Sequence, residues 1–426
     1  MALKIPEFAD VPITFVGHPF APIGMGEQMR SHVQAASALG LHHRVFDIFR
    51  YAQRSDAAHF ATLGELERRD IPGGIRIFHI NGDEVGPVLE AFEARGGNFA
   101  AGYNIIVPAW ELPTYPAVWA KQLARFDEVW ALSAFIQQGL ARAGVASPLI
   151  GQSVQMPVGP NLPRRWFGIR ESAFVLLNFF DLSSYATRKN PEAVRLLFER
   201  IRSEQPFLDI QLVLKVKQGE RGAEDWAREF DYDPQIRVIA TPLDSLGVRS
   251  LMVACDCFVS LHRSEGFGRG LGEAMALGRL AMGTAWSGNL DFMTETNSLL
   301  VRQEQVALQE DEYPHWQGQS WAERGARAGT VASGAARPGA RHGDGAARAD
   351  RRAAHAQPSG GGGADSDAAG ADRRGDGEAG GRRATQGAGR RLVRGGADSG
   401  RTATALPERA RFTPRPVPAR AAPSAR

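Results

Sequence analysis

The 426-residue sequence contains only two cysteines, Cys255 and Cys257, and no long apolar segment. Two cysteines cannot make a disulfide-rich scaffold, so a reducing, intracellular setting is expected. Runs of about 18 or more apolar residues are absent, which excludes a membrane-spanning helix. The first residues, MALKIPEFADVPITF, lack a basic start followed by a long apolar core, so we expect no secretory signal. These absences favour a cytoplasmic protein.

The net charge of +3 conceals two regions of opposite sign. Residues 324–426 hold 20 Arg, no Lys and nine acidic residues, whereas residues 1–323 hold 30 basic and 38 acidic residues. The Arg-rich segment consists mainly of Gly, Ala and Arg, and it has few large apolar side chains. Such a segment cannot bury enough apolar surface to offset the entropy of ordering it. We therefore expect residues 324–426 to be disordered.

The abrupt change of composition after Glu323 suggests a frameshifted C-terminus. A GC-rich gene read in the wrong frame yields Ala, Arg, Gly and Pro whatever it once encoded. A natural low-complexity tail is the alternative. A third interpretation is an arm that binds nucleic acid or an anionic membrane. Aromatic residues that would stack on bases are nearly absent from the segment, so we do not expect nucleic acid as a partner.

Residues 1–323 alternate short apolar runs with amphipathic helical patterns, in two blocks that a Pro- and Gly-bearing stretch near 157–163 separates. This alternation predicts an α/β fold with two parallel sheets covered by helices. We expect an N-terminal domain over residues 1–160 and a C-terminal domain over residues 161–323. The predicted strands span 13–16, 44–49, 75–80, 103–109, 128–132, 174–180, 210–216, 236–240 and 257–261, and the predicted helices span 27–39, 115–126, 134–143, 190–202, 245–254 and 270–277.

The segment SEGFGRGLGEAMA, residues 264–276, combines two glutamates with four glycines at a predicted strand–helix turn. Free N–H groups at a helix start, together with glycines that permit close approach, suit a phosphate. Glu265 and Glu273 are placed to accept hydrogen bonds from sugar hydroxyls. On spacing alone, a glycine-rich turn with a solvated pair of glutamates explains the pattern equally well.

Several motifs together resemble the retaining, nucleotide-sugar-dependent glycosyltransferases of family 4, which have the GT-B fold. SLHRSEGFGRGLGEAMALG followed by GNLDFM resembles the family's E-x7-E signature. RKNP at 188–191 resembles its donor-phosphate segment, and LVLK at 212–215 resembles the strand that comes next. PIGMGE at 22–27 resembles the glycine-rich loop, and AWELP with EVWALSAF resembles the middle of the first domain. The likeness covers roughly residues 11–323 and implies two Rossmann-like domains that face a cleft.

The resemblance also implies residue roles. Glu265 would contact the donor sugar, Glu273 the ribose, and Lys189 with Arg188 the diphosphate as it leaves. The turn at Ser287, Gly288 and Asn289 would offer backbone N–H groups to the same phosphates. The donor-binding turn would further include Gly266, Phe267 and Gly268.

Four further residues carry weaker signals. Lys215 ends a predicted strand, where its ammonium would hold a phosphate. The alternative is that its aliphatic chain covers the edge of the sheet while its charge reaches water. Gly24 and Gly26 precede a helix predicted to begin at Glu27, where they would let an acceptor or the donor phosphates approach closely. A lone G-x-G, however, often marks only a tight turn. Glu111 in AWELP is a candidate for contacting the acceptor or the sugar, and we count it with Glu265 as catalytic.

The sequence therefore predicts a retaining glycosyltransferase that moves a hexose from a GDP- or UDP-linked donor to a glycan or lipid-linked acceptor in bacterial surface polysaccharide synthesis. No metal-ligand spacing occurs, and the GT-B resemblance implies metal independence, so we expect no cofactor beyond the donor itself. Peripheral contact with the inner face of the membrane fits this role. The alternative is an inactive or unstable frameshifted remnant, with an incomplete second domain, that at most binds nucleotide sugar.

Overall fold

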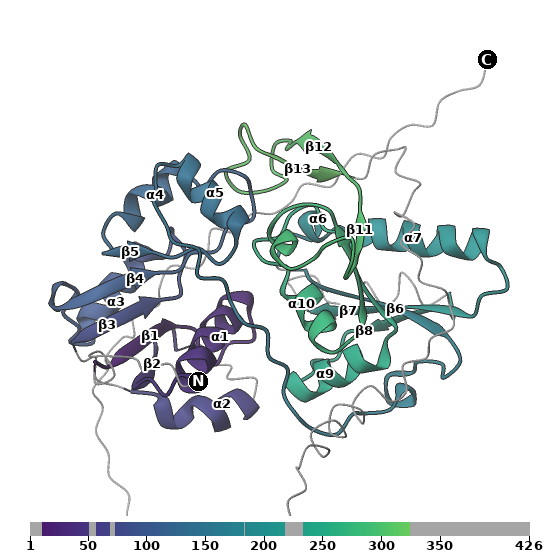
Figure 1. Ribbon diagram of the computed structural model, residues 1–426, viewed down its shortest axis with the longest axis horizontal. Helices are drawn as coiled ribbons and strands as arrows, with labels where there is room; N and C mark the ends of the chain where they lie inside the picture. Colours follow the sequence, from purple (N-terminus) through teal and green to yellow (C-terminus); the bar gives the residue numbers. More distant parts are fainter. Residues whose placement is uncertain (1–10, 51–56, 69–72, 183, 218–232, 324–426) are drawn as a thin grey trace, which may run out of the picture. The chain divides into compact units, whose positions relative to one another are not determined.

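The computed structural model describes residues 11–50, 57–68, 73–182, 184–217 and 233–323, all of them within one unit of the chain, residues 1–340. They form a five-stranded parallel sheet, a six-stranded parallel sheet and a two-stranded antiparallel hairpin (Figure 1). The expected α/β fold class, with two parallel sheets covered by helices, is confirmed. The expected disordered tail, residues 324–426, lies outside the described residues.

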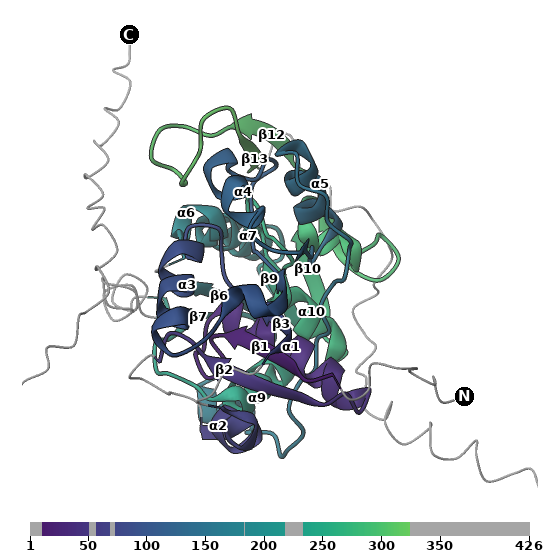
Figure 2. The same cartoon turned by 90° about the vertical axis from the view of Figure 1, so that its left-hand side faces the viewer.

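The first sheet has the strand order β2-β1-β3-β4-β5. β1 lies between β2 and β3 (Figure 2). Its strands are β1 (Ile13–Gly17), β2 (His43–Asp47), β3 (Gly74–Phe78), β4 (Gly102–Ile106) and β5 (Glu128–Val129). Its helical segments are α1 (Gly24–Ala38), α2 (Ala57–Leu63), η1 (Gly64–Leu66), α3 (Val85–Ala94), η2 (Phe99–Ala101), α4 (Ala117–Leu123) and α5 (Ala134–Arg142).

One apolar core surrounds this sheet, because the strands bury side chains on both faces. Phe15 and Val16 of β1, with Phe78 of β3, are fully buried in it. Residues from a distant part of the chain complete the core, since Tyr313 and Trp321 pack into it. They belong to the hairpin of β12 (Glu304–Ala307) and β13 (Ser320–Glu323). The end of the expected second domain is thus joined to the first apolar core, and the expected boundary at 160/161 stays a prediction.

The second sheet has the order β11-β10-β9-β6-β7-β8, and all its strands are parallel. Its strands are β6 (Phe174–Asp181), β7 (Ile210–Lys217), β8 (Ile236–Ile239), β9 (Cys257–Ser260), β10 (Leu280–Thr284) and β11 (Leu299–Val301). Its helical segments are η3 (Arg164–Phe167), α6 (Ala186–Lys189), α7 (Pro191–Glu204), α9 (Ser245–Ala254), α10 (Arg269–Ala276) and η4 (Gly288–Asp291).

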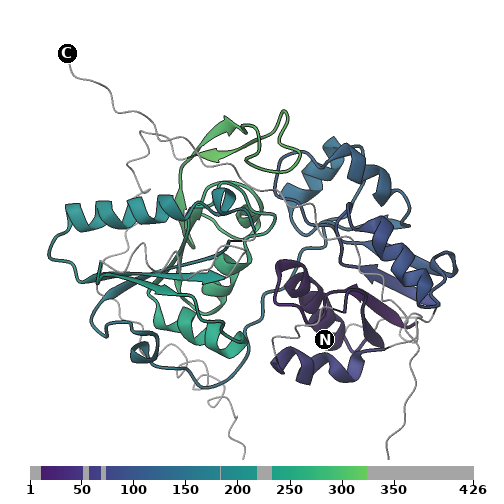
Figure 3. The ribbon, with the colours of Figure 1, turned by 180° about the vertical axis from the view of Figure 1, so that it is seen from behind.

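The two faces of the second sheet carry separate apolar clusters. One cluster joins the sheet to α9 and α10 through Leu251 and Leu271. The other joins it to α7 through Val194 and Phe198. The helices accordingly lie on opposite sides of the sheet (Figures 1 and 3). Both cysteines are buried within these clusters, as expected for small core residues.

β6 and β9 are neighbours in the second sheet, and the strand order reverses between them. From β6 the chain continues to β7 and β8 on one side, and β9, β10 and β11 then follow on the other side. In open parallel sheets, ligands bind beyond the carboxyl ends of the strands at such a switch point. The segments that follow β6 and β9 contain Lys189 and Glu265, respectively. The topology therefore places both at the expected ligand-binding edge.

Several element limits differ from the predictions. α1 begins at Gly24 and not at Glu27, so Gly24 and Gly26 lie inside its first turn. β7 continues to Lys217, so Lys215 is not its last residue. The sequence analysis did not predict α2, α3, β10, β11 or the hairpin. α3 nevertheless carries Val85, Val88, Leu89 and Phe92 at helical spacing, so its pattern was visible in the sequence. No described helix has the length and apolar character needed to cross a lipid bilayer.

Candidate functional site

The backbone between β6 and α7 is shaped by two residues in the left-handed conformation. Tyr185 precedes the single turn of α6 with φ of 55°, and Asn190 follows it with φ of 52°. Pro191 then occupies the first position of α7, where its missing N–H costs no hydrogen bond. The Asn190 side chain donates to the carbonyl oxygen of Leu261, at the end of β9, at 3.1 Å. This contact holds the lysine-bearing turn against the glutamate-bearing turn.

Glu265 is brought into direct contact with both predicted cations. The Nζ atom of Lys189 lies 2.5 Å from one carboxylate oxygen, and Nη1 of Arg188 lies 3.3 Å from the other. The Glu265 side chain is only 13% exposed. Burial alone would raise its pKa, but the two cations outweigh burial and lower the pKa of Glu265 to about 2. The carboxylate is therefore ionised at neutral pH and acts as a hydrogen-bond acceptor.

Arg188 is a buried anchor of this cluster, with a side chain only 3% exposed. Its guanidinium donates to the carbonyl oxygen of Ser264 at 2.9 Å and to the hydroxyl of Ser184 at 3.1 Å. It also lies 3.8 Å from Glu111, which reaches the cluster from the first sheet. Lys189 is 23% exposed, so it is the more accessible cation. Arg188 is thus the buried cation beside Glu265, and the contact of Lys189 with a phosphate stays a prediction.

Tyr313 is a member of the cluster that the sequence did not reveal. Its hydroxyl donates to Glu111 at 2.8 Å, and its ring lies 5.9 Å from the guanidinium carbon of Arg188. Burial raises the pKa of Tyr313 well above its usual value, and the Glu111 carboxylate raises it further, so the phenol remains a donor at neutral pH. Glu111 is thereby fixed at both oxygens.

His262 is fully buried beside the same cluster. Burial lowers the pKa of His262 to about 4, and the charges of Lys189 and Arg188 act in the same direction against the opposing effect of Glu265. The imidazole is therefore neutral at physiological pH and adds no third cation to the site.

The glycines of the predicted donor turn allow close contact between two backbone segments. A Cβ atom on Gly288 would lie 2.0 Å from the carbonyl oxygen of Gly266, and one on Gly266 would lie 2.9 Å from the carbonyl oxygen of Trp110. Gly268 has φ of 85° and would place a Cβ 3.0 Å from the Cβ of Asn289. These glycines therefore serve the packing of the turn itself.

Polar contacts fix the same turn. The Gly288 N–H, expected to face a phosphate, donates to the carbonyl oxygen of Glu265 at 2.9 Å and is paired within the protein. Asn289 is fully buried and donates through its amide to Thr284 at 2.9 Å, while Phe267 stacks near Phe292 with ring centroids 5.1 Å apart. The predictions that these three residues contact the donor stay predictions.

Two serines hold the glutamate-bearing turn from either side. Ser133 caps α5 by accepting from the Ile136 N–H at 3.2 Å, and it also donates to the carbonyl oxygen of Gly266 at 2.5 Å. Ser287, which has φ of 76°, accepts from the Glu265 N–H at 2.8 Å. A non-glycine residue held in this conformation costs energy, and such strain gathers at functional sites.

Glu273 belongs to a second charged cluster. Nε of Arg269 lies 2.7 Å from its carboxylate, and Nη2 of Arg269 lies 3.3 Å from the carboxylate of Glu27 on α1. Burial raises the pKa of Glu273, and the nearby Glu27 charge adds to this effect, whereas Arg269 opposes it. Lys189 therefore pairs with Glu265, and Arg269 pairs with Glu273.

Lys215 lies outside both clusters. Burial and the charge of Lys217 lower its pKa, and its ammonium donates to the carbonyl oxygen of Val216 at 3.1 Å. Lys217 pairs with Asp181 at 3.2 Å and donates to Pro22 at 2.6 Å, so it reaches the loop before α1. A phosphate role for Lys215 stays a prediction.

The two glycines of α1 differ in their surroundings. A Cβ on Gly26 would lie 2.3 Å from the carbonyl oxygen of Ala21, so this glycine permits the helix to pack on the preceding loop. A Cβ on Gly24 would meet no atom within 4 Å. Gly24 therefore has open space around it, and a ligand role for either glycine stays a prediction.

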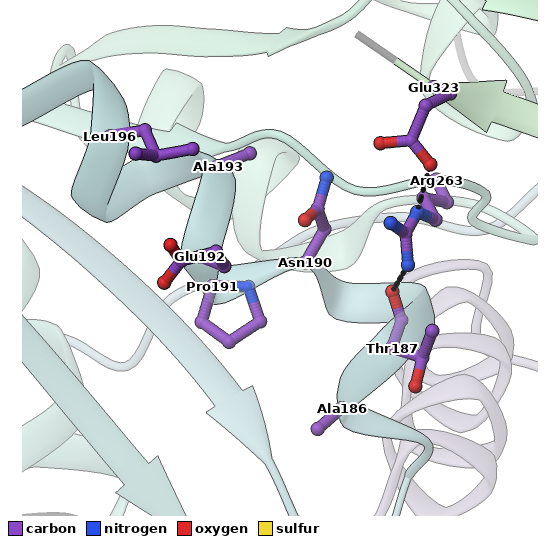
Figure 4. A pocket seen from close by; sticks show the side chains of 9 residues that line it. All are labelled: Ala186, Thr187, Asn190, Pro191, Glu192, Ala193, Leu196, Arg263 and Glu323. Carbon is purple, nitrogen blue, oxygen red and sulfur yellow. Dashed lines mark hydrogen bonds and ion pairs between the residues drawn. The ribbon is translucent and has the colours of Figure 1, made fainter. Parts of the chain in front are cut away.

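A pocket of about 420 Å³ opens beside the lysine-bearing turn (Figure 4). Arg263 crosses it, pairing with Glu323 at 2.8 Å and donating to the carbonyl oxygen of Thr187 at 3.1 Å. The predicted donor-binding residues are not part of its lining. The pocket is lined by Ala186, Thr187, Asn190, Pro191, Glu192, Ala193, Leu196, Arg263 and Glu323.

No protein-family model and no curated protein sequence matches the chain. Solved structures similar to it include Anabaena Alr3699/HepE in complex with UDP and glucose, at 14% identity over 68% of this chain and 86% of that chain, with a TM-score of 0.44. The lipopolysaccharide outer core galactosyltransferase WaaB matches at 16% identity over 68% and 85%, with a TM-score of 0.45. The catalytic domain of starch synthase IV from Arabidopsis thaliana, bound to ADP and acarbose, matches at 11% identity over 68% and 88%, with a TM-score of 0.48. At these values the similarity concerns architecture and assigns no activity.

Proposed function

We propose that the chain is a retaining glycosyltransferase that transfers a hexose from a nucleoside-diphosphate sugar to a glycan or lipid-linked acceptor. One observation carries the proposal. Glu265 and Lys189 come from the two segments that flank the β6/β9 switch point, and their charged groups are in contact at 2.5 Å. A carboxylate and an accessible ammonium at this edge suit a sugar and a phosphate, respectively.

The reaction requires a cation where negative charge develops. The bond between the sugar C1 and the phosphate oxygen breaks, a bond from C1 to the acceptor oxygen forms on the same face, and the acceptor proton passes to the leaving phosphate. In this proposal, Lys189 stabilises that phosphate and Glu265 accepts hydrogen bonds from the sugar. Glu111, held by Tyr313, orients the acceptor or the sugar, and Glu273 accepts from the ribose hydroxyls.

The cellular role rests on the sequence resemblance. We propose that the acceptor belongs to a surface polysaccharide assembled at the inner face of the membrane, with the protein cytoplasmic or peripherally bound there. The donor carries GDP or UDP, and no cofactor besides the donor takes part. Neither the base nor the hexose follows from the residues of the site, because a few hydrogen bonds in the pocket decide them.

Titration of the full chain with UDP-, GDP- and ADP-linked hexoses tests the proposal. Lys189→Met should weaken binding of the preferred donor by roughly tenfold to a hundredfold, since a charge-assisted contact to the diphosphate is lost. Lys121→Met, at an exposed lysine of α4, is the matched control and should leave binding unchanged. Equal binding by wild type and Lys189→Met would remove the lysine from the donor site, and absence of binding to all three donors would reject the proposal.

An inactive remnant that at most binds nucleotide sugar is the second candidate, and one observation favours it. Within the described residues, α7 is the helix that packs on its face of the second sheet, while Leu280, Leu299 and Val301 remain only partly buried there. Incompletely covered apolar strands lower stability and promote aggregation. A single cooperative melt of the full chain, together with measurable sugar transfer, would reject this candidate; donor binding without transfer would support it.

A further inference from the structure

Arg269 stands where a cation is locally unfavourable. It is the first residue of α10, and the positive end of a helix dipole disfavours a positive side chain there. Its side chain is nevertheless 18% exposed and largely buried, and its Nη1 atom is buried without a hydrogen-bond partner. A residue that breaks a local rule in this way signals a functional constraint.

The guanidinium of Arg269 joins two helices that belong to different sheets. It contacts Glu273 on its own helix α10 at 2.7 Å and Glu27 on α1 at 3.3 Å. Glu27 also pairs with Arg30 at 2.6 Å and lies 3.7 Å from His59 of α2. Although burial works against ionisation, His59, Arg30 and Arg269 together lower the pKa of Glu27 far below its usual value. Arg269 is therefore the cation that the two carboxylates share.

We propose that Arg269 is a positioning residue that holds the ribose-binding carboxylate of Glu273 in an ion pair and ties it to α1 through Glu27. This inference rests on the proposed function, because it takes Glu273 as the ribose contact. The coupling makes the nucleotide-binding helix α10 and the helix that carries Gly24 parts of one charged network. A ligand that engages Glu273 therefore acts on α1 as well.

Removal of Arg269 leaves the partly buried carboxylates of Glu27 and Glu273 without the cation that they share. The basic side chains around them are then those of Arg30 and His59, and both of these lie beside Glu27. Glu273 has no second cation, so its pKa rises further and the carboxyl takes up a proton at a higher pH. A protonated carboxyl is a weaker acceptor for ribose hydroxyls than a carboxylate.

The first experiment measures the affinity of the full chain for UDP and GDP between pH 5 and pH 8.5. In Arg269→Leu, the pH at which half of the affinity is lost should rise by about one unit, and Arg269→Lys should restore it. Arg195→Leu, which removes a partly exposed arginine that pairs with Glu192 and Glu199 on α7, is the control and should leave the midpoint unchanged. An unchanged midpoint in Arg269→Leu would overturn the proposal.

The second experiment does not need a nucleotide. Glu27→Gln should lower Tm by fewer degrees in the Arg269→Leu background than in wild type, because one of the cations that Glu27 binds has already been removed. Equal losses in the two backgrounds would overturn the tie between α1 and α10. If wild type binds neither nucleotide, the proposed function fails, and this melting cycle still decides whether Arg269 couples the two helices.

Discussion

Glu265 lies on the turn that precedes α10, and Glu273 lies on α10 itself. The surroundings of these two glutamates differ. Glu265 contacts two cations, Lys189 and Arg188, and its pKa falls to about 2. Glu273 shares one cation, Arg269, with a second carboxylate, and its pKa is raised. Both side chains are buried, so burial alone does not separate them. The number of cations within contact distance sets the direction of each shift.

This difference separates two kinds of carboxylate within one sequence motif. Glu265 is held as a fixed charge, which suits a group that must accept hydrogen bonds from a sugar throughout a reaction. Glu273 shares its one cation with Glu27 and its pKa is raised, so its charge depends more on its neighbours. The sequence spacing of the two glutamates gives no sign of this, because their partners come from distant segments.

The largest effect is expected for Glu265→Gln. The substitution keeps the shape of the side chain but leaves Lys189 and Arg188 without their carboxylate in a buried site. Breaking a buried ion pair in this way costs about 3–5 kcal/mol of unfolding free energy. Sugar transfer should also be lost, since the hydrogen-bond acceptor for the donor is replaced by an amide. Denaturant unfolding and a transfer assay measure the two effects.

The pH dependence of stability tests the charge state of Glu265 directly. The folded pKa of Glu265, about 2, lies below its ordinary value of 4.5, so its stabilising contribution is present above pH 4.5 and is lost as the pH falls towards 2. The difference in Tm between wild type and Glu265→Gln should therefore shrink over that interval. Wild-type turnover in Glu265→Gln would remove this carboxylate from the mechanism, whatever the stability change.

An intermediate effect is expected for Gly288→Ala. The added Cβ would lie 2.0 Å from the carbonyl oxygen of Gly266, so the glutamate-bearing turn has to move. Overpacking of this kind costs about 1–3 kcal/mol and should also reduce transfer. Gly24→Ala is the matched control: its Cβ meets no atom within 4 Å, and the change should be neutral or stabilising by up to about 1 kcal/mol. Equal melting temperatures for the two variants would show that the turn accommodates the methyl group.

The contact between Glu265 and Lys189 could be anticipated from the sequence because both residues follow buried parallel strands. The carboxyl ends of such strands share one edge of a sheet, so the fold class already brings the two segments together. The β6/β9 switch point, which the structure shows, is what makes them neighbours.

Other parts of the site could not be anticipated. Tyr313 reaches Glu111 from a hairpin whose apolar residues show no regular alternation, so neither its strands nor its packing on the first core was predictable. The bridge from Arg269 to Glu27 depends on how helices of two different sheets approach each other, and local propensity carries no information about that. The i, i+4 spacing of Arg269 and Glu273 was visible and would have identified their pair.

The smallest effect is expected for Glu273→Gln. The substitution removes one of two carboxylates that share Arg269, and the guanidinium keeps its contact with Glu27. It also removes a carboxylate whose raised pKa shows that folding disfavours its charge, so the lost ion pair is offset by relief of that cost. The unfolding free energy should therefore change by less than about 1 kcal/mol at pH 7. Nucleotide affinity should nevertheless fall, because an amide is a weaker acceptor for the ribose than a carboxylate. A stability loss as large as that of Glu265→Gln would contradict the distinction between the two carboxylates, since it would mean that Glu273 is held as firmly in its charged form.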